Sequence, residues 1–187
     1  KMWDFPVPID CTIIPQFKKV INFAGNSDSW KFEFVKEWTY DTVELRVTSQ
    51  KADWAKGKNV SFLGWFNDDF LLVNALRKSG GFGLVWTNSQ YWSEYMALNA
   101  NYKISAYLAA GIPVIVSNHI AEKETIVRKN LGFAVDSLNE AVDKVNKMSE
   151  AEYSEMVANV AIYSNLIREG YFTKRLLIEA VFKLLYD

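Results

Sequence analysis

The sequence alternates short apolar runs with longer segments of helical period. Runs of strand length lie at residues 19–24, 43–48, 60–63, 83–86, 113–117 and 132–135. The middle runs are apolar enough to be covered on both faces, which is typical of strands in a parallel sheet with helices between them. The alternation predicts an α/β fold, a Rossmann-like, doubly wound six-stranded parallel sheet with helices on both faces.

Capping residues and glycines indicate where several helices begin and end. Serine or asparagine accepts the first free amide hydrogens of a helix, and glycine enters the left-handed conformation that often ends one. The expected starts are Asn67, Ser137 with Glu140, and Ser149 with Glu152, and the expected ends are Gly80, Gly111 and Gly170. Residues 141–147, 150–168 and 174–186 are expected to be helical, so the C-terminal tail follows the last strand and must pack on another surface.

The length and composition indicate one domain. With 187 residues, of which 50% are hydrophobic and 15% aromatic, the chain can bury one sizeable core. Residues 1–18 contain three of the four prolines. We expect this segment to lie outside the core, as an interdomain linker or the end of an N-terminal domain absent from this chain, and residues 19–187 to form the folded domain.

Charge and cysteine content exclude several classes of protein. The 21 basic and 22 acidic residues are interspersed, which argues against a nucleic-acid partner. Cys11 is the only cysteine, so no intrachain disulfide can form, as is typical of the reducing cytoplasm. Apolar runs are far shorter than the roughly 20 residues of a membrane helix, and residues 1–8 do not resemble a signal peptide. We therefore expect a cytoplasmic location and no membrane span.

The loop after the first strand is one candidate ligand site. Ligands of open parallel sheets bind beyond the carboxyl ends of the strands, where the strand order reverses. Gly25, Asn26 and Ser27 would let the backbone, or short side chains, approach a phosphate. An ordinary turn with a capping serine explains the same residues, and the loop is neither a GxGxxG nor a Walker sequence.

Lys103 gives the stronger signal. Asn99 or Asn101 is expected to cap the following helix, which places Lys103 in its first turn, where the helix dipole disfavours a cation by ~0.3–1 kcal/mol. A pyrophosphate beside the helix start would bind both the free amides and the ammonium group. The alternative is a solvated surface lysine.

Aromatic and amide side chains could complete this site. Tyr95, Asn99 and Lys103 recur at four-residue spacing and share a face if the segment is one helix, so Tyr95 and Asn99 could reach the sugar or ribose. Capping and packing alone would also explain them. Of the seven tryptophans, Trp65 at the end of the third strand is best placed to stack on a sugar ring, and most others are expected in the core or an interface.

Neither the acidic pair nor the single histidine predicts a metal site. Asp68 and Asp69 follow the expected cap Asn67, and helix starts favour acidic residues without any metal. His119 follows the fifth strand and could contact a sugar hydroxyl or phosphate. We expect instead that it forms hydrogen bonds within its own loop and has no role in binding.

Six segments carry a resemblance to a known family: residues 2–4, 21–26, 80–86, 94–95, 103–116 and 168–174. In this order they resemble the donor-binding half of GT-B glycosyltransferases. The resemblance is closest to the bacterial subfamily containing β-1,6-galactofuranosyltransferases and the accessory glucosyltransferases that extend O-linked GlcNAc on serine-rich-repeat adhesins. Two departures leave the sugar open: residues 47–50 replace an expected glycine turn, and Thr87 and Asn88 replace an expected acid.

The resemblance implies one half of a two-domain hexosyltransferase. Residues 19–187 would bind a UDP-hexose of the glucose or galactose/galactofuranose type, without a metal or other cofactor, and Lys103 would stabilise the leaving group. An N-terminal domain would supply the general base and the contacts to a glycan or glycosylated-protein acceptor, inversion would be expected, and the helix near residues 176–186 would cross to that domain. The candidate substrate-binding residues are Gly25, Asn26, Ser27, Trp65, Tyr95, Asn99, Asn101, Tyr102, Lys103 and Ile104.

Two other functions remain possible at this level. An NAD-dependent oxidoreductase would share the architecture, but the chain lacks the GxGxxG turn and an acidic residue at the end of the second strand. A non-catalytic domain could use the same fold for oligomerisation or docking. Assembly of several copies of the chain also remains open.

Overall fold

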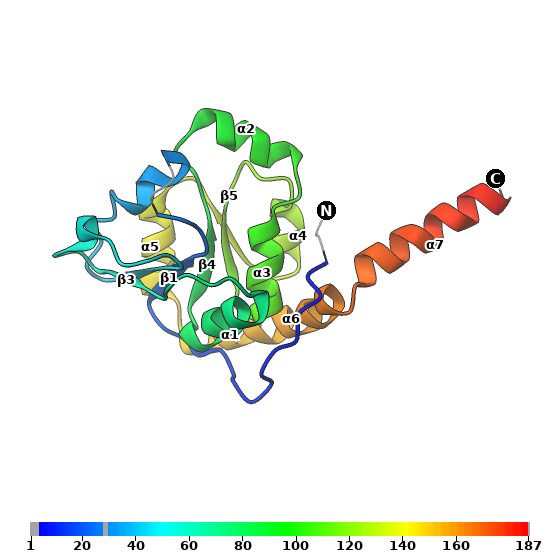
Figure 1. Ribbon diagram of the computed structural model, residues 1–187, viewed down its shortest axis with the longest axis horizontal. Coiled ribbons are helices and arrows are strands. Elements are labelled where there is room, and N and C mark those ends of the chain that lie inside the picture. Colours follow the sequence, from blue (N-terminus) through cyan, green and yellow to red (C-terminus); the bar gives the residue numbers. More distant parts are fainter. Residues whose placement is uncertain (1–3, 28–29, 187) are drawn as a thin grey trace.

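The computed structural model describes residues 4–27 and 30–186, and within them the chain forms a six-stranded parallel sheet in the order β3-β2-β1-β4-β5-β6 (Figure 1). The order runs outward from β1 to β3 and then reverses, so the switch point lies between β1 and β4. The predicted doubly wound sheet is confirmed. The strands are β1 Val20–Phe23, β2 Glu44–Val47, β3 Val60–Phe62, β4 Phe82–Val85, β5 Val114–Ser117 and β6 Gly132–Val135.

Helices connect the strands and form the C-terminal part of the chain. Two short 3-10 segments are η1 Trp30–Val35 and η2 Asp53–Ala55. The helix α4 lies between β5 and β6, where a helix was expected without stated bounds, and the segment around residue 100 divides into two helices, α2 and α3. The α-helices are α1 Asp69–Ser79, α2 Gln90–Leu98, α3 Tyr102–Ala110, α4 Lys123–Arg128, α5 Leu138–Lys147, α6 Glu150–Arg168 and α7 Tyr171–Tyr186.

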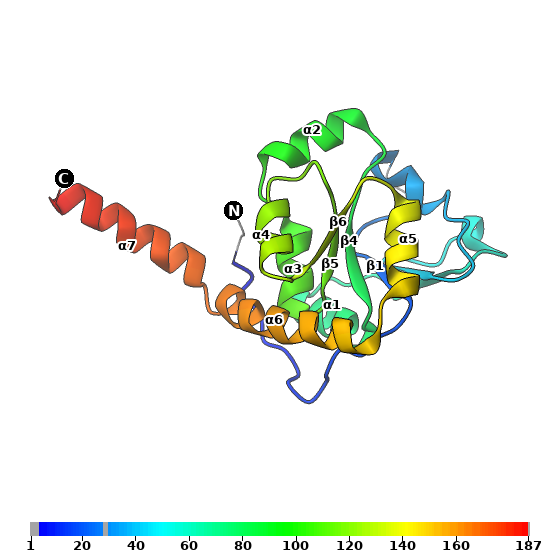
Figure 2. The ribbon, with the colours of Figure 1, turned by 180° about the vertical axis from the view of Figure 1, so that it is seen from behind.

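Helices cover both faces of the sheet, as predicted. One core joins the sheet to α1, α3, α4 and α6, and the other joins it to η1, α5 and the start of α6. Figure 2 shows α5 on the opposite side of the sheet from α3 and α4, with α6 passing along one edge. The carboxyl ends of the strands therefore remain the accessible edge, beside α2 and the start of α3.

The expectation that residues 1–18 lie outside the core is wrong in part. Phe5 and Val7 are 4% and 6% exposed and belong to the core that contains α3. The Phe5 N–H donates to the Ile167 carbonyl at 3.0 Å, and the Phe5 ring lies 5.0 Å from the Tyr102 ring. Residues 2 and 3, which contributed to the resemblance, lie outside the described residues.

Most expected helix boundaries are confirmed, with one correction at α1. Ser149 and Glu152 form a complete capping box at the start of α6. At the start of α5, Ser137 caps the helix, but the Glu140 carboxylate accepts the Asp136 N–H and not the Ser137 N–H of a reciprocal box. Asp68, not Asn67, caps α1, because its carboxylate accepts the Leu71 N–H at 3.0 Å. Positive φ angles occur, as expected, at Gly80, Gly111 and Gly170.

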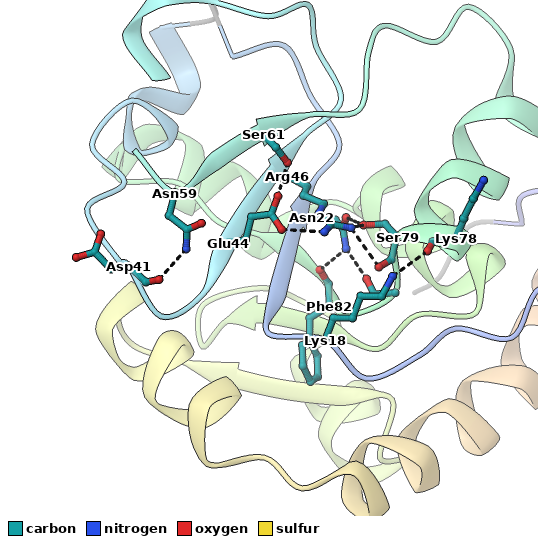
Figure 3. Close-up of polar contacts among 11 residues, drawn as sticks. Lys18, Asn22, Asp41, Glu44, Arg46, Asn59, Ser61, Lys78, Ser79 and Phe82 are labelled. Carbon is teal, nitrogen blue, oxygen red and sulfur yellow. Dashed lines mark hydrogen bonds and ion pairs between the residues drawn. The ribbon is translucent and has the colours of Figure 1, made fainter. Parts of the chain in front are cut away.

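A network of polar side chains joins β1 and β2 to the end of α1 (Figure 3). Asn22 in β1 is fully buried, and its amide nitrogen donates to the Gly80 and Phe82 carbonyls at 2.7 and 3.2 Å. The Ser79 hydroxyl donates to the Asn22 amide oxygen at 2.6 Å. In the same view, Arg46 bonds to Ser79 at 3.1 Å and forms an ion pair with Glu44 at 2.8 Å. The polar groups buried here are therefore paired with one another.

The replacement Glu44→Gln is expected to make unfolding less dependent on pH in the acid range. Burial alone would raise the pKa of the Glu44 carboxyl, but hydrogen bonds from Arg46 and Ser61 outweigh it and hold that pKa below its usual range. A lowered folded-state pKa contributes stability above the unfolded-state pKa, and this contribution is lost as pH falls through the folded-state value. Between pH 7 and pH 3, the free energy of unfolding measured with urea should therefore fall less for Glu44→Gln than for the unchanged chain. The exposed Glu33, replaced by Gln, is the control, and equal slopes for both variants would contradict the assignment.

The C-terminal helix α7 extends away from the body of the protein (Figures 1 and 2). None of its side chains is buried, although most are apolar. Asp4 caps it, because the carboxylate accepts the N–H groups of Phe172 and Thr173 at 3.1 and 2.6 Å. No helix in the described part of the chain has the length and apolarity needed to cross a membrane. The large exposed apolar side chains of α7 are Tyr171, Leu176, Leu177, Ile178, Val181, Phe182, Leu184, Leu185 and Tyr186.

Candidate functional site

A pocket of about 280 Å³ opens at the carboxyl edge of the sheet. We name it the β1–α3 pocket, because it lies between the loops that follow β1, β2 and β3 and the start of α3. It adjoins the switch point between β1 and β4, where ligands bind in open parallel sheets. It is lined by Ala24, Gly25, Asn26, Thr48, Trp65, Phe66, Leu72, Tyr102, Lys103 and Ala106.

The start of α3 gives this pocket a positive end. Asn101 is the N-cap, and its side-chain oxygen accepts the Lys103 N–H at 3.0 Å. The first turn of α3 contains no acidic residue, and Lys103 lies within it, as the sequence predicted. The helix dipole and the ammonium group therefore add at one place, which favours an anion.

Tyr95, Asn99 and Lys103 do not share one helix face, so that interpretation of their spacing is wrong. The helix α2 ends at Leu98 and Asn99 is its C-cap, in an extended conformation, before α3 begins. Tyr95 is 50% exposed on α2 and does not line the pocket. The reason is that Asn99 and Asn101 each occupy a helix boundary, and a four-residue spacing has no meaning across a break.

The Lys103 side chain lies against two phenylalanine rings. Its Nζ is 4.9 Å from the centroid of the Phe32 ring and 5.9 Å from that of Phe23. Gly25 leaves space for this arrangement, since a Cβ at that position would lie 2.8 Å from Phe23 Cε1 and 3.6 Å from Lys103 Cε. A glycine is required here for the close approach of neighbouring side chains.

Tyr107 and Thr48 fix the loop after β1, and the sequence did not reveal either role. The buried Tyr107 hydroxyl accepts the Ala24 N–H at 2.7 Å and donates to the Leu84 carbonyl at 3.1 Å. The Gly25 N–H donates to Thr48 Oγ1 at 3.1 Å. Burial raises the pKa of the Tyr107 hydroxyl, which keeps it protonated as a donor. These two amides are thus used within the protein, and the start of α3 supplies the positive end of the pocket.

Two other candidate residues lie outside the pocket. Ser27 is 1% exposed, and its hydroxyl forms a hydrogen bond of 2.8 Å with the Ser49 hydroxyl. Ile104 is also 1% exposed and packs in the core. Neither side chain lines the pocket, because each is buried against other parts of the protein.

Two exposed aromatic rings form the rim of the pocket. Trp65 is 57% exposed, and its Nε1–H donates to the Asn67 side-chain oxygen at 2.6 Å. Tyr102 donates from its hydroxyl to Asp69 Oδ1 at 3.2 Å. Burial, and then the charge and hydrogen bond of Asp69, raise the pKa of Tyr102 to about 12. Both rings are oriented by polar partners and remain more than half exposed, although the Tyr102 ring also packs against Phe5.

Both side chains of the acidic pair have identified local partners. Asp68 caps α1 and Asp69 accepts from Tyr102, so neither needs a metal to explain its position. No group of three or more His, Cys, Asp and Glu side chains suited to a metal occurs in the described ranges. His119 is exposed after β5, and its backbone N–H donates to Ser117 Oγ at 3.3 Å.

A larger hollow of about 650 Å³ lies near the carboxyl ends of β5 and β6, beside α4. It is less suited to an anion, because its basic side chains have acidic neighbours. Lys144 pairs with Glu140 at 2.9 Å, and Glu124 lines the hollow itself. The β1–α3 pocket is therefore the candidate site. The larger hollow is lined by Asn118, Lys123, Glu124, Thr125, Val127, Arg128, Phe133, Ala134 and Lys144.

Comparisons with known proteins place this geometry among glycosyltransferase domains. Residues 21–180 match the family described as "Glucosyltransferase 3-like, C-terminal domain". The chain is 41% identical over 191 residues to "Glucosyltransferase 3" of Streptococcus parasanguinis, covering 100% of this chain and 54% of that protein. It is 27% identical over 190 residues to "Beta-1,6-galactofuranosyltransferase WbbI" of Escherichia coli (strain K12), covering 97% and 56% respectively. The chain thus spans about half the length of these curated relatives.

A solved structure shows the same fold at low sequence identity. It is the C-terminal domain of a glycosyl transferase group 1 family protein (LpcC) from Francisella tularensis, with a TM-score of 0.53 and 17% identity. The match covers 86% of this chain and 89% of that one.

Proposed function

The chain belongs to the family of glucosyltransferase 3-like C-terminal domains, and from this premise we propose that it is the donor-binding half of a glycosyltransferase. The family membership confirms the resemblance seen in the sequence. In this proposal a UDP-hexose occupies the β1–α3 pocket, with its diphosphate at the start of α3 and beside Lys103. The hexosyl group is of the glucose or galactofuranose type, in keeping with the names of the two relatives.

The observation that carries the proposal is the placement of Lys103 in the first turn of α3, at the wall of the pocket. When the bond between the sugar and the diphosphate breaks, the bonding electron pair stays with UDP, whose negative charge increases. A fixed ammonium group and the positive end of the α3 dipole stabilise that charge without rearrangement, and a metal is not needed for this step. Lys103 is therefore the leaving-group stabiliser, and the reaction is independent of a metal cofactor.

The aromatic rim supports a role in holding the rest of the donor. Trp65 and Tyr102 expose 57% and 53% of their surface beside the pocket. An oriented aromatic face suits the uracil base or the apolar face of a sugar ring. Asn26 supplies a short polar side chain at the same opening.

The remaining steps belong to the other half of the longer protein. We assign the acceptor, a glycan or glycosylated protein, and the general base to that N-terminal half, with inversion at the transferred carbon. The segment that precedes β1 then connects the two halves, with Phe5 and Val7 packed in the core of this domain. The exposed apolar side chains of α7 are the surface that would pack on the other half, and a cytoplasmic location would suit a UDP-sugar donor.

The dinucleotide alternative has no support from the residues after β2. Thr48 and Ser49 stand where an NAD-binding domain would place an acid for the ribose hydroxyls. Both are buried, and Thr48 accepts the Gly25 N–H.

Thermal unfolding with different ligands tests the proposed function. UDP, UDP-glucose and UDP-galactose should each raise the melting temperature, because a ligand at 100 times its Kd stabilises by about 2.7 kcal/mol. NAD at the same concentration should leave the melting temperature unchanged. The UDP shift should persist in EDTA if no metal is required. Stabilisation by NAD and not by UDP would overturn the proposal.

A further inference from the structure

The rings beneath Lys103 form a rigid aromatic platform. Phe23 in β1 is fully buried, and the Phe32 ring meets it edge to face, with 4.8 Å between the ring centroids. Phe34 contacts Phe23 in the same way at 5.2 Å. Phe32 itself is partly buried, so one part of its ring packs on the core while the Lys103 ammonium lies 4.9 Å from its centroid.

The backbone departs from helical geometry at Phe32. The 3-10 segment η1 is interrupted at Phe32, whose φ and ψ angles are −130° and 38°. This break separates Phe32 from the regular turn that buries Phe34 and Val35. Gly25 meanwhile leaves room for the Lys103 stem to reach the platform.

We propose that Phe32 is a positioning residue that holds the Lys103 ammonium at the wall of the β1–α3 pocket for the diphosphate. This role rests on the proposed function. Contact with the ring restricts the rotamers that the four-carbon lysine stem samples, so less of the stem has to be ordered when a phosphate binds. A cation near an aromatic face is attracted by the ring quadrupole, while a partly apolar surrounding also strengthens its attraction to an anion. Phe32 thus acts on the nucleotide only through Lys103.

The replacement Phe32→Leu separates the aromatic contribution from simple packing, because leucine remains apolar and bulky. We expect UDP to bind roughly two- to five-fold more weakly to this variant, the size of effect that an exposed cation–π contact gives. Uridine, which has no phosphate, should bind as it does to the unchanged chain. Phe32→Tyr keeps the ring and should restore UDP affinity.

A double-mutant cycle and a spectroscopic measurement exclude a merely structural role. In a Lys103→Ala background, Phe32→Leu should cause no additional loss of UDP affinity, because the residue through which it acts is gone. In NMR spectra of the ligand-free chain, the Lys103 ε-protons should be shifted upfield by the ring current, and Phe32→Leu should reduce this shift. An equal loss of affinity in both backgrounds, or an equal loss for uridine, would overturn the role of Phe32.

The same cycle distinguishes this inference from the function beneath it. If Lys103→Ala left UDP affinity unchanged, the placement of the diphosphate would be wrong, and the role of Phe32 would fall with it. If Lys103→Ala had its full effect and Phe32→Leu had none, only the role of Phe32 would be overturned.

Discussion

Replacing Lys103 with alanine is expected to weaken UDP binding by roughly ten- to a hundredfold. A charge-assisted contact to a phosphate contributes roughly 1.5–3 kcal/mol, which corresponds to that range of Kd. The partial charge of the α3 start remains in the variant, because Asn101 still caps the helix, so some affinity should persist. Isothermal titration with UDP measures the change directly.

Two controls make the Lys103 result specific. Lys123→Ala removes one positive charge from the larger hollow near α4 and should leave UDP affinity unchanged. Lys103→Arg keeps the charge with a different shape, so it should retain part of the affinity lost in the alanine variant. A Lys103→Ala chain that bound UDP as tightly as the original would remove the basis for placing the diphosphate at α3.

Replacing Gly83 with alanine is expected to destabilise the fold by roughly 3 kcal/mol, which is severe for a single methyl group. Gly83 lies in the central strand β4, paired with both β1 and β5, and an added Cβ would overlap the Tyr107 ring. That ring cannot move aside easily, because its hydroxyl is bound to Ala24 on one side and Leu84 on the other. The melting temperature should fall by roughly 6–12 °C for a chain of this size.

A second glycine provides the comparison. Gly57 has a φ of 76° and would place a Cβ with nothing within 4 Å, so Gly57→Ala introduces backbone strain without a collision. Its cost should be about 1 kcal/mol. If calorimetry gave Gly83→Ala a loss no greater than that of Gly57→Ala, the close packing of Tyr107 on β4 would be refuted.

The described elements differ from those predicted mainly at their ends. The run at 83–86 proved to be β4 Phe82–Val85, shifted by one residue, since Phe82 is buried and Trp86 is only half-buried. The expected Asn67 cap was displaced by Asp68 because the Asn67 side chain binds Trp65 instead. Either residue could cap the helix, and one hydrogen bond decides which of them does. The periodicity of the sequence does not predict that bond.

Local chemistry determined the order of the strands and helices, the capping of α6, and the presence of Lys103 in the first turn of α3, because each depends on residues within a few positions of one another. Only the tertiary structure decided which side chains meet at the β1–α3 pocket. It brought Thr48 and Phe32 to the site, buried Ser27 and Ile104, and drew Phe5 into the core. Contacts between distant segments depend on how strands and helices pack, and the same sequence pattern is compatible with several such arrangements.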